Sequence, residues 1–140
     1  MAMTRVLERL YLGDARDADH LSVSNPFCIT AVVNVNTAPN HSKRDEINYV
    51  HFPLGESCRV PPLRLEQVIT TIGELVRAGK VLVHCVAGSS RSPVIVALYM
   101  DVIGYENFDD AVSHLRELRS VVAPSKLIID SARAYLKEMT

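Results

Sequence analysis

One stretch of the sequence, HCVAGSSRS from His84 to Ser92, combines residue types that could carry out nucleophilic chemistry on an anion. It contains a thiol, Cys85, and a cation, Arg91, separated by five residues. Apolar segments come before and after it, in KVLV and in PVIVALYM. A buried core needs no polar interruption of this kind, so we interpret the stretch as a reactive loop.

The residues between Cys85 and Arg91 suit a loop that binds phosphate. The pattern predicts a strand, then this loop, then a helix that begins near Ser92. Backbone N–H groups at a helix N-terminus are unpaired and carry partial positive charge, so they form an anion site. Residues 87–90 are small enough for the loop to curl with its amides turned inward, and Gly88 can adopt a positive φ. The Arg91 guanidinium offers a planar pair of donors that matches two phosphate oxygens.

The same positive potential should act on the Cys85 thiol. A free thiol has a pKa of about 8.5, which a helix N-terminus or a nearby cation lowers to roughly 3.5–7.5. Cys85 would then be a thiolate nucleophile at neutral pH, and the Ser92 hydroxyl could hydrogen-bond to its sulfur. Alternatively, Cys85 is a small buried apolar residue, as most free cysteines are. Its spacing from Gly88, Arg91 and Ser92 favours the reactive interpretation.

The stretch also resembles the signature of the cysteine-dependent protein tyrosine phosphatases, His-Cys-x5-Arg-Ser/Thr. Its ending, SRS, is similar to that of the dual-specificity branch. The segments RLYLGDARDA, ITAVVNV and INYVHFPLGES occur in the family's usual order, so the resemblance covers nearly the whole chain. It implies one dual-specificity phosphatase-like catalytic domain over residues 1–140. That domain would hydrolyse phosphotyrosine and phosphoserine or phosphothreonine in proteins.

The resemblance also implies a role for each residue of the motif. Cys85 is the nucleophile and forms a phosphocysteine, Arg91 binds the substrate and the transition state, and Ser92 assists breakdown of the intermediate. His84 orients the loop and tunes the thiol. The phosphate oxygens are bound by the backbone amides of Val86, Ala87, Gly88, Ser89, Ser90 and Arg91. No metal or organic cofactor is implied.

The general acid is the point at which the sequence departs from the family. The family's acid is an aspartate in a loop that reads Pro-x-x-Asp-Ser; here the loop is PLGES, so the best candidate is Glu56. The extra methylene moves the carboxyl by roughly 1 Å, and a misplacement of that size can cost about 100-fold in rate. Glu56 could instead be a solvated loop residue, as surface carboxylates usually are. Asp45 is a weaker candidate, in the polar segment NHSKRDE, which we interpret as a hairpin connection.

The glutamate leaves a second function open, a phosphoprotein-binding module that keeps the anion loop but turns over poorly. An intact Cys85 argues against it. A sulfurtransferase or an arsenate reductase is a third possibility, but relatives that resemble arsenate reductases carry Cys-x5-Arg near the N-terminus. The lack of Gly-Lys-Ser/Thr excludes a Walker-type nucleotide loop. Relatives that resemble phosphoinositide phosphatases have basic residues inside the loop. The corresponding positions here, none of them basic, are Val86, Ala87, Ser89 and Ser90.

The elements that must position this loop follow from hydrophobic periodicity and from caps. Strand patterns cover residues 6–13, 29–35, 47–52 and 80–84. Helix patterns cover residues 14–20, 65–75, 92–103, 107–119 and the segment from 124 onward. Asn107 is a suitable N-cap for the fourth helix. Strands that alternate with helices predict an α/β domain, with a central, largely parallel, twisted sheet flanked by helices and the Cys-x5-Arg loop between a buried strand and a buried helix.

Composition excludes several other classes of protein. With 48% hydrophobic and 22% charged residues, the 140-residue chain is typical of a folded, soluble domain. Its formal net charge of -1 gives no field that would attract nucleic acid or an anionic membrane. The longest apolar run is too short to span a bilayer. We expect a cytoplasmic monomer whose partner is a phosphorylated protein or peptide.

The three cysteines form no CxxC pair and no zinc pattern, which favours a reducing compartment. Cys28 comes before a predicted buried strand, and we expect it to be structural. Cys58 lies close in sequence to Glu56 and could form a reversible disulfide with Cys85 under oxidation.

Overall fold

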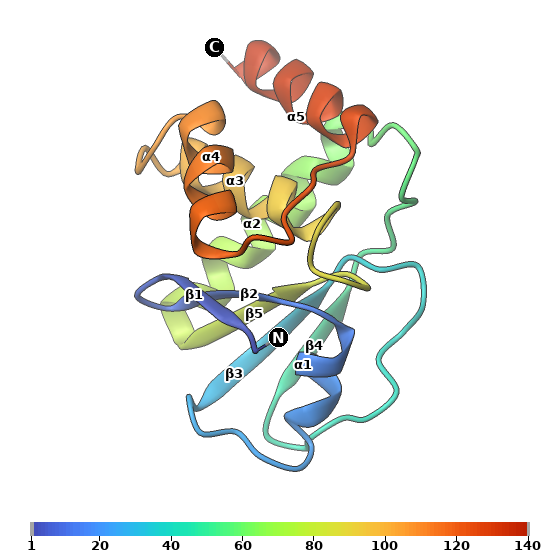
Figure 1. The fold of residues 1–140 in the computed structure, drawn as a ribbon, viewed down its shortest axis with the longest axis vertical. Helices are drawn as coiled ribbons and strands as arrows, with labels where there is room; N and C mark the ends of the chain where they lie inside the picture. Colours follow the sequence, from blue (N-terminus) through green and yellow to red (C-terminus); the bar gives the residue numbers. More distant parts are fainter. Residues whose placement is uncertain (1, 140) are drawn as a thin grey trace.

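A five-stranded sheet lies at the centre of the computed structural model, which describes residues 2–139 (Figure 1). The strand order is β1-β2-β5-β3-β4. All neighbouring strands are parallel except β1 and β2, so the predicted largely parallel sheet is confirmed. The strands are β1 (Thr4–Leu7), β2 (Leu10–Gly13), β3 (Ile29–Asn34), β4 (Asn48–His51) and β5 (Lys80–His84).

Within residues 2–139, five helices cover the two faces of the sheet (Figure 1). Alternation along β5 explains the two layers: Val81 and Val83 belong to the main core with the long helices, whereas Leu82 packs in a smaller cluster on the face of the sheet that carries α1. The helices are α1 (Ala15–His20), α2 (Pro62–Ala78), α3 (Ser92–Val102), α4 (Phe108–Leu118) and α5 (Lys126–Met139). The first nine residues of α3 are all buried, as its apolar sequence predicts.

Local caps fix where several helices begin. Asn107 caps α4 as predicted, because its side chain accepts a hydrogen bond from the Asp110 amide. Asp14 caps α1 in a reciprocal capping box with Asp17, which the sequence analysis did not anticipate. Pro62 and Pro93 each lie in the first helical turn, where a missing N–H costs nothing.

Two sequence predictions are wrong. The segment 6–13 is not one strand: it forms the antiparallel pair β1 and β2, which turns at the exposed residues Glu8 and Arg9. Residues 40–46 are not a hairpin connection, because β3 and β4 are parallel. The chain between them must instead cross from the carboxyl end of β3 to the amino end of β4. Short-range alternation does not reveal which strand a segment will pair with, and this explains both errors.

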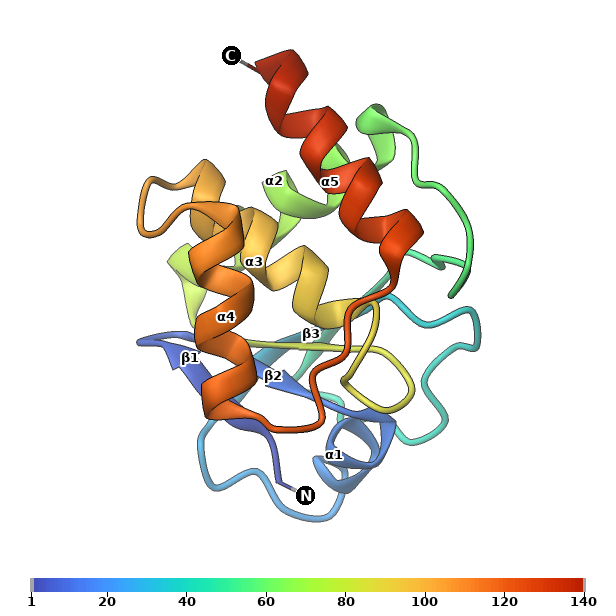
Figure 2. The ribbon, with the colours of Figure 1, turned by 45° about the horizontal axis from the view of Figure 1, so that its top comes forward.

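The carboxyl ends of the parallel strands lie at one edge of the sheet, where ligands gather in folds of this class. The loops that leave this edge contain residues 35–47, 52–61 and 85–91. In Figure 2 the loop after β5 lies beside the segment that joins α4 to α5. Among the described residues no helix is long and apolar enough to cross a membrane.

The packing of the central strand β5 predicts how much a substitution in it should destabilise the protein. Leu82 is fully buried on the α1 side of β5, so Leu82→Ala should lower the free energy of unfolding by about 2–5 kcal/mol. The matched control is Leu63→Ala on α2, where the side chain is exposed and the change should stay within about 0.5 kcal/mol. Urea unfolding followed by circular dichroism measures both. Equal effects of the two variants would contradict this packing.

Candidate active site

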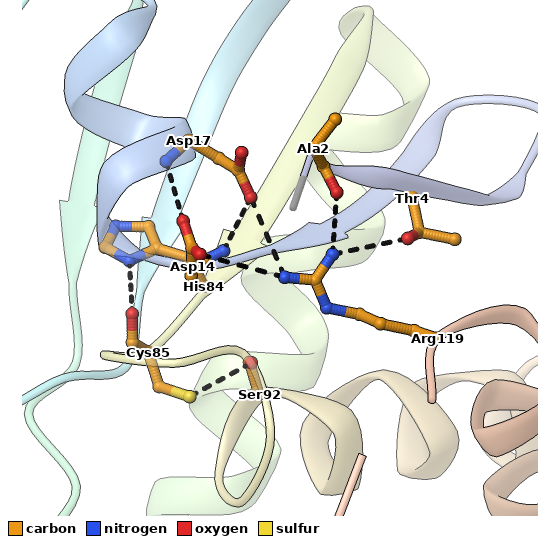
Figure 3. A network of polar contacts seen from close by, with 8 residues as sticks. All are labelled: Ala2, Thr4, Asp14, Asp17, His84, Cys85, Ser92 and Arg119. Carbon is orange, nitrogen blue, oxygen red and sulfur yellow. Dashed lines mark hydrogen bonds and ion pairs between the residues drawn. The ribbon is translucent and has the colours of Figure 1, made fainter. Parts of the chain in front are cut away.

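Cys85 lies between the end of β5 and the start of α3, at the bottom of the loop 85–91. It is 1% exposed, and its Sγ lies 3.2 Å from the Ser92 Oγ (Figure 3). Gly88, halfway round the loop, has a φ of +68°, the left-handed conformation that glycine adopts without penalty. The Sγ–Oγ distance confirms the predicted contact between the Ser92 hydroxyl and the Cys85 sulfur.

Several donors converge on the Cys85 sulfur. Burial alone raises the pKa of this thiol, but the hydrogen bond from the Ser92 hydroxyl and those from the backbone amides of Ser92, Arg91 and Gly88 lower it by more. The net effect is a lowered pKa, which favours the thiolate. The same inward-pointing amides are the groups that an anion above the sulfur would use.

Arg91 is buried next to this loop with part of its guanidinium unused. It is 4% exposed, and its Nη1 donates to the Leu54 carbonyl at 3.0 Å. Its Nε is buried and has no hydrogen-bond partner among residues 2–139. A buried donor without a partner costs about 1–3 kcal/mol, and an anionic ligand whose oxygen accepted a hydrogen bond from this N–H would remove that cost.

His84 is held as a neutral ring behind the cysteine. Its Nδ1–H donates to the Cys85 carbonyl at 3.0 Å, and its Nε2 accepts from the Asn40 side-chain amide at 2.9 Å. Burial lowers the pKa of His84, so the ring stays uncharged at neutral pH. This geometry fixes the carbonyl of the cysteine residue. Asn40 was not anticipated, because it lies 44 positions away in the sequence.

The candidate acid Glu56 lies at the rim of the loop. Its Oε1 accepts a hydrogen bond from the Ser90 hydroxyl at 3.2 Å, and its side chain is exposed. The neighbouring Leu54 is buried in the main core and holds Arg91, so the two segments are joined at two points. Asp45 precedes β4, at the opposite edge of the sheet from the loop, and the structure does not bring it to Cys85.

The outward-facing carbonyls of the loop are bound by neighbouring segments. The Val86 carbonyl accepts from the Ala15 amide at 2.9 Å, at the start of α1. The Ser89 carbonyl accepts from Ala123 at 2.8 Å, and the Ser90 carbonyl accepts from Ser125 at 3.3 Å. These carbonyls share peptide units with the amides of Ala87, Ser90 and Arg91, and the Arg91 amide is one of those that hydrogen-bond to the Cys85 sulfur.

The other two cysteines lie outside this arrangement. Cys28 and Cys58 are free and exposed, and Cys85 is also free. Cys28 therefore does not pack in the core as a structural cysteine would; it occupies a turn with a φ of +59°. A disulfide between Cys58 and Cys85 stays a prediction. Within the described residues, no group of three or more His, Cys, Asp or Glu side chains could hold a metal ion.

The chain is similar in sequence to known phosphatases. Residues 10–136 match the family model described as "Dual specificity phosphatase, catalytic domain". The chain is 32% identical over 122 residues to dual specificity protein phosphatase 5 of Rattus norvegicus, covering 86% of this chain and 32% of that protein. It is 30% identical over 123 residues to dual specificity protein phosphatase 1 of Homo sapiens, covering 86% of this chain and 33% of that protein. The chain thus spans about a third of the length of these curated relatives.

Solved structures agree with the fold. The crystal structure of DUSP15 superposes with a TM-score of 0.82 at 28% identity, covering 99% of this chain and 86% of that one. The crystal structure of human DUSP28 superposes with a TM-score of 0.85 at 22% identity, covering 97% of this chain and 96% of that one. The second likeness is one of fold alone.

The state of the thiol can be measured directly. The rate of Cys85 alkylation by iodoacetate should rise with pH around a midpoint below about 8.5, the value of a free thiol. Ser92→Ala removes a donor to the sulfur and should move this midpoint to higher pH. Ser113→Ala, an exposed serine on α4, is the matched control and should leave it unchanged. Peptide mapping separates Cys85 from the exposed thiols. A midpoint that Ser92→Ala does not move would contradict the geometry.

Proposed function

The chain belongs to the dual specificity phosphatase family, and from this premise we propose that it hydrolyses phosphate monoesters on phosphotyrosine and phosphoserine or phosphothreonine of proteins. The reaction passes through a phosphocysteine on Cys85. The observation that carries the proposal is the Cys85 thiol of lowered pKa, surrounded by converging amides and close in the chain to Arg91, whose buried Nε has no partner among the described residues. A thiolate beside unpaired donors is suited to attack a tetrahedral dianion.

The first step transfers the phosphoryl group to sulfur. The Cys85 thiolate attacks phosphorus, the S–P bond forms and the P–O bond to the substrate breaks. Glu56 gives its proton to the leaving oxygen. The non-bridging oxygens lie against the loop amides and the Arg91 guanidinium, which stabilise the charge spread over them in the transition state.

The second step releases phosphate. A water molecule attacks phosphorus, Glu56 takes up the water's proton, and the S–P bond breaks. The Cys85 sulfur leaves as a thiolate, and the Ser92 hydroxyl stabilises it through the contact at 3.2 Å. His84, neutral and bound to the Cys85 carbonyl, keeps the loop in place through both steps.

Glu56 as general acid is supported by its contact with Ser90, which keeps the carboxyl at the mouth of the loop. The Cys58 side chain packs closely against the preceding residue: a Cβ on Gly55 would lie 2.6 Å from the Cys58 Sγ. The conformational freedom of glycine at this position offers a way to offset the longer glutamate side chain. If the backbone does not bring the Glu56 carboxyl to the leaving oxygen, the second function holds instead: a phosphoprotein-binding module with weak turnover.

The walls of the loop favour protein substrates. Val86 and Ala87 are exposed beside the sulfur, and neither carries a charge. A ligand with several phosphates would need cations at these positions to compensate its additional charge. A single phosphate on a side chain needs only the amides and Arg91. The proposal includes a reducing, cytoplasmic setting, which the three free thiols support.

Turnover of p-nitrophenyl phosphate tests the proposed activity. Wild-type protein should hydrolyse it with inhibition by orthovanadate, and Cys85→Ser should reduce kcat by more than about 10³-fold because the nucleophile is lost. Cys28→Ser, at an exposed thiol outside the site, is the matched control and should keep full activity. Wild-type protein that binds a phosphopeptide without turnover would support the binding module instead.

A test of Glu56 as the general acid needs two substrates whose leaving groups differ in their need for a proton. Glu56→Gln should lower kcat by about 10²–10⁴ for a phosphoserine peptide, whose alkoxide must be protonated as it leaves. The loss should be much smaller for p-nitrophenyl phosphate, whose phenolate leaves without help. Asp45→Asn, an exposed carboxylate far from the loop, is the control. Equal losses on both substrates would show that Glu56 is not the acid.

A further inference from the structure

The phosphate loop depends on two neighbouring segments that are far apart in the sequence. One is the start of α1, where the Ala15 amide binds the Val86 carbonyl. The other is the segment 119–125, whose Ala123 and Ser125 amides bind the Ser89 and Ser90 carbonyls. These carbonyls belong to the peptide units whose amides are those of Ala87, Ser90 and Arg91, and the Arg91 amide is one of those that hydrogen-bond to the Cys85 sulfur. Whatever holds the two segments together therefore also shapes the anion site.

Arg119 is the side chain that joins them. It caps the C-terminus of α4, begins the second segment and is 1% exposed. Its Nη2 lies 3.8 Å from the Asp17 Oδ2 and 4.0 Å from the Asp14 Oδ2, both at the start of α1 (Figure 3). Its Nη1 donates to the Ala2 carbonyl at 2.8 Å and to the Thr4 Oγ1 at 3.3 Å. The guanidinium thus ties α4, α1 and β1 together behind the loop.

The loop itself packs against this junction at Gly88. A Cβ built on Gly88 would lie 2.5 Å from the Gly13 carbonyl oxygen and 3.1 Å from the Arg119 Nη2. The turn of positive φ that points the Gly88 amide at the sulfur is therefore in direct contact with both β2 and the guanidinium. The missing Cβ of Gly88 is what allows the Gly13 carbonyl and the Arg119 guanidinium to lie this close to the loop.

We propose that Arg119 is a positioning residue for the phosphate loop, acting through the α1 carboxylates and through Gly88 to keep the loop amides aimed at the Cys85 sulfur. This inference rests on the proposed function of that site. Arg119 does not touch the sulfur or the substrate. It acts by fixing the two segments that bind the loop's outer carbonyls.

The charge of Arg119 is needed as well as its shape. Asp14 and Asp17 are largely buried at 16% and 11% side-chain exposure, and they lie close together in the capping box. Burial raises the pKa of Asp17, and the charge of Arg119 opposes that effect. Without the guanidinium, two neighbouring carboxylates would be left behind the loop without a cation, and a buried charge that loses its partner destabilises its surroundings.

Arg119→Met is the direct test. In the folded variant we expect kcat/KM for p-nitrophenyl phosphate to fall about 10- to 100-fold, because small misplacements of catalytic groups have effects of that size. Inhibition by orthovanadate should weaken, and the midpoint of Cys85 alkylation should move to higher pH. The matched control is Arg133→Met, which removes an exposed arginine paired with Asp109 at 2.8 Å and should change none of the three. Arg119→Lys keeps the charge and should recover part of the loss.

A double-mutant cycle separates positioning from simple stabilisation. Ala15→Pro removes only the amide that binds the Val86 carbonyl, at the first position of α1, where proline is tolerated. If Arg119 acts through α1, Arg119→Lys should cost less in kcat/KM once this bond is gone, giving a non-additive cycle. This cycle decides the question even where Arg119→Met does not fold.

The outcomes are distinct. A folded Arg119→Met protein with the wild-type alkylation midpoint and vanadate inhibition would overturn the inference and leave the proposed function standing. An additive cycle in Arg119→Lys would overturn it in the same way. A wild-type protein whose Cys85 titrates like a free thiol and which vanadate does not inhibit would overturn the proposed function, and this inference with it.

Discussion

The site depends on peptide groups whose N–H bonds point at one sulfur atom. Amides of Gly88, Arg91 and Ser92 lower the pKa of Cys85 even though burial acts in the opposite direction. Peptide units can keep this orientation only if their carbonyls are bound elsewhere, since an unpaired buried carbonyl is costly. The Ser90 carbonyl, in the peptide unit of the Arg91 amide, is bound by the Ser125 amide after α4, and the Arg91 carbonyl, in the unit of the Ser92 amide, is bound by the Ile95 amide within α3. Helices α1 and α4 lie on opposite faces of the sheet, and the start of α1 and the segment after α4 both reach the loop at the carboxyl ends of the strands.

Buried polar groups accumulate around this loop, and several of them have hydrogen-bond partners or lie near a carboxylate. His84 is bound at both ring nitrogens, Ser92 by the sulfur, and Arg119 by two carbonyl or hydroxyl oxygens and two nearby carboxylates. Three buried guanidinium nitrogens have no hydrogen-bond partner among the described residues: the Nε of Arg91, and the Nε and Nη2 of Arg119. The Arg119 Nη2 still has the Asp17 and Asp14 carboxylates at 3.8 and 4.0 Å. The Arg91 Nε belongs to the residue that the proposed function assigns to the phosphate, so a bound oxyanion would supply its missing partner.

The loop 52–61 contacts both the hydrophobic core and the loop 85–91. Leu54 anchors it in the core and binds Arg91 through its carbonyl, and Glu56 reaches Ser90 on the other side of the mouth. The Cys58 side chain packs against Gly55 between these two contacts, where a Cβ would lie 2.6 Å from its Sγ. The segment that carries Glu56, the proposed acid, is thus linked to the loop 85–91 at Leu54 and at Glu56.

The sequence by itself determined the reactive loop, because its chemistry is local. Cys85, Gly88, Arg91 and Ser92 act together within a few residues, so their types and spacing predicted the curled loop, the sulfur–hydroxyl contact and the buried helix that follows. Local patterns also predicted the parallel sheet and the Asn107 cap. Only the tertiary structure decided that residues 6–13 fold back as a hairpin, that residue 45 lies at the far edge, and that Asn40 and Arg119 support the loop. The physical reason is that these features depend on which distant segments become neighbours. The spacing of residues along the chain does not reveal a contact between residues 44 positions apart, such as that of Asn40 with His84.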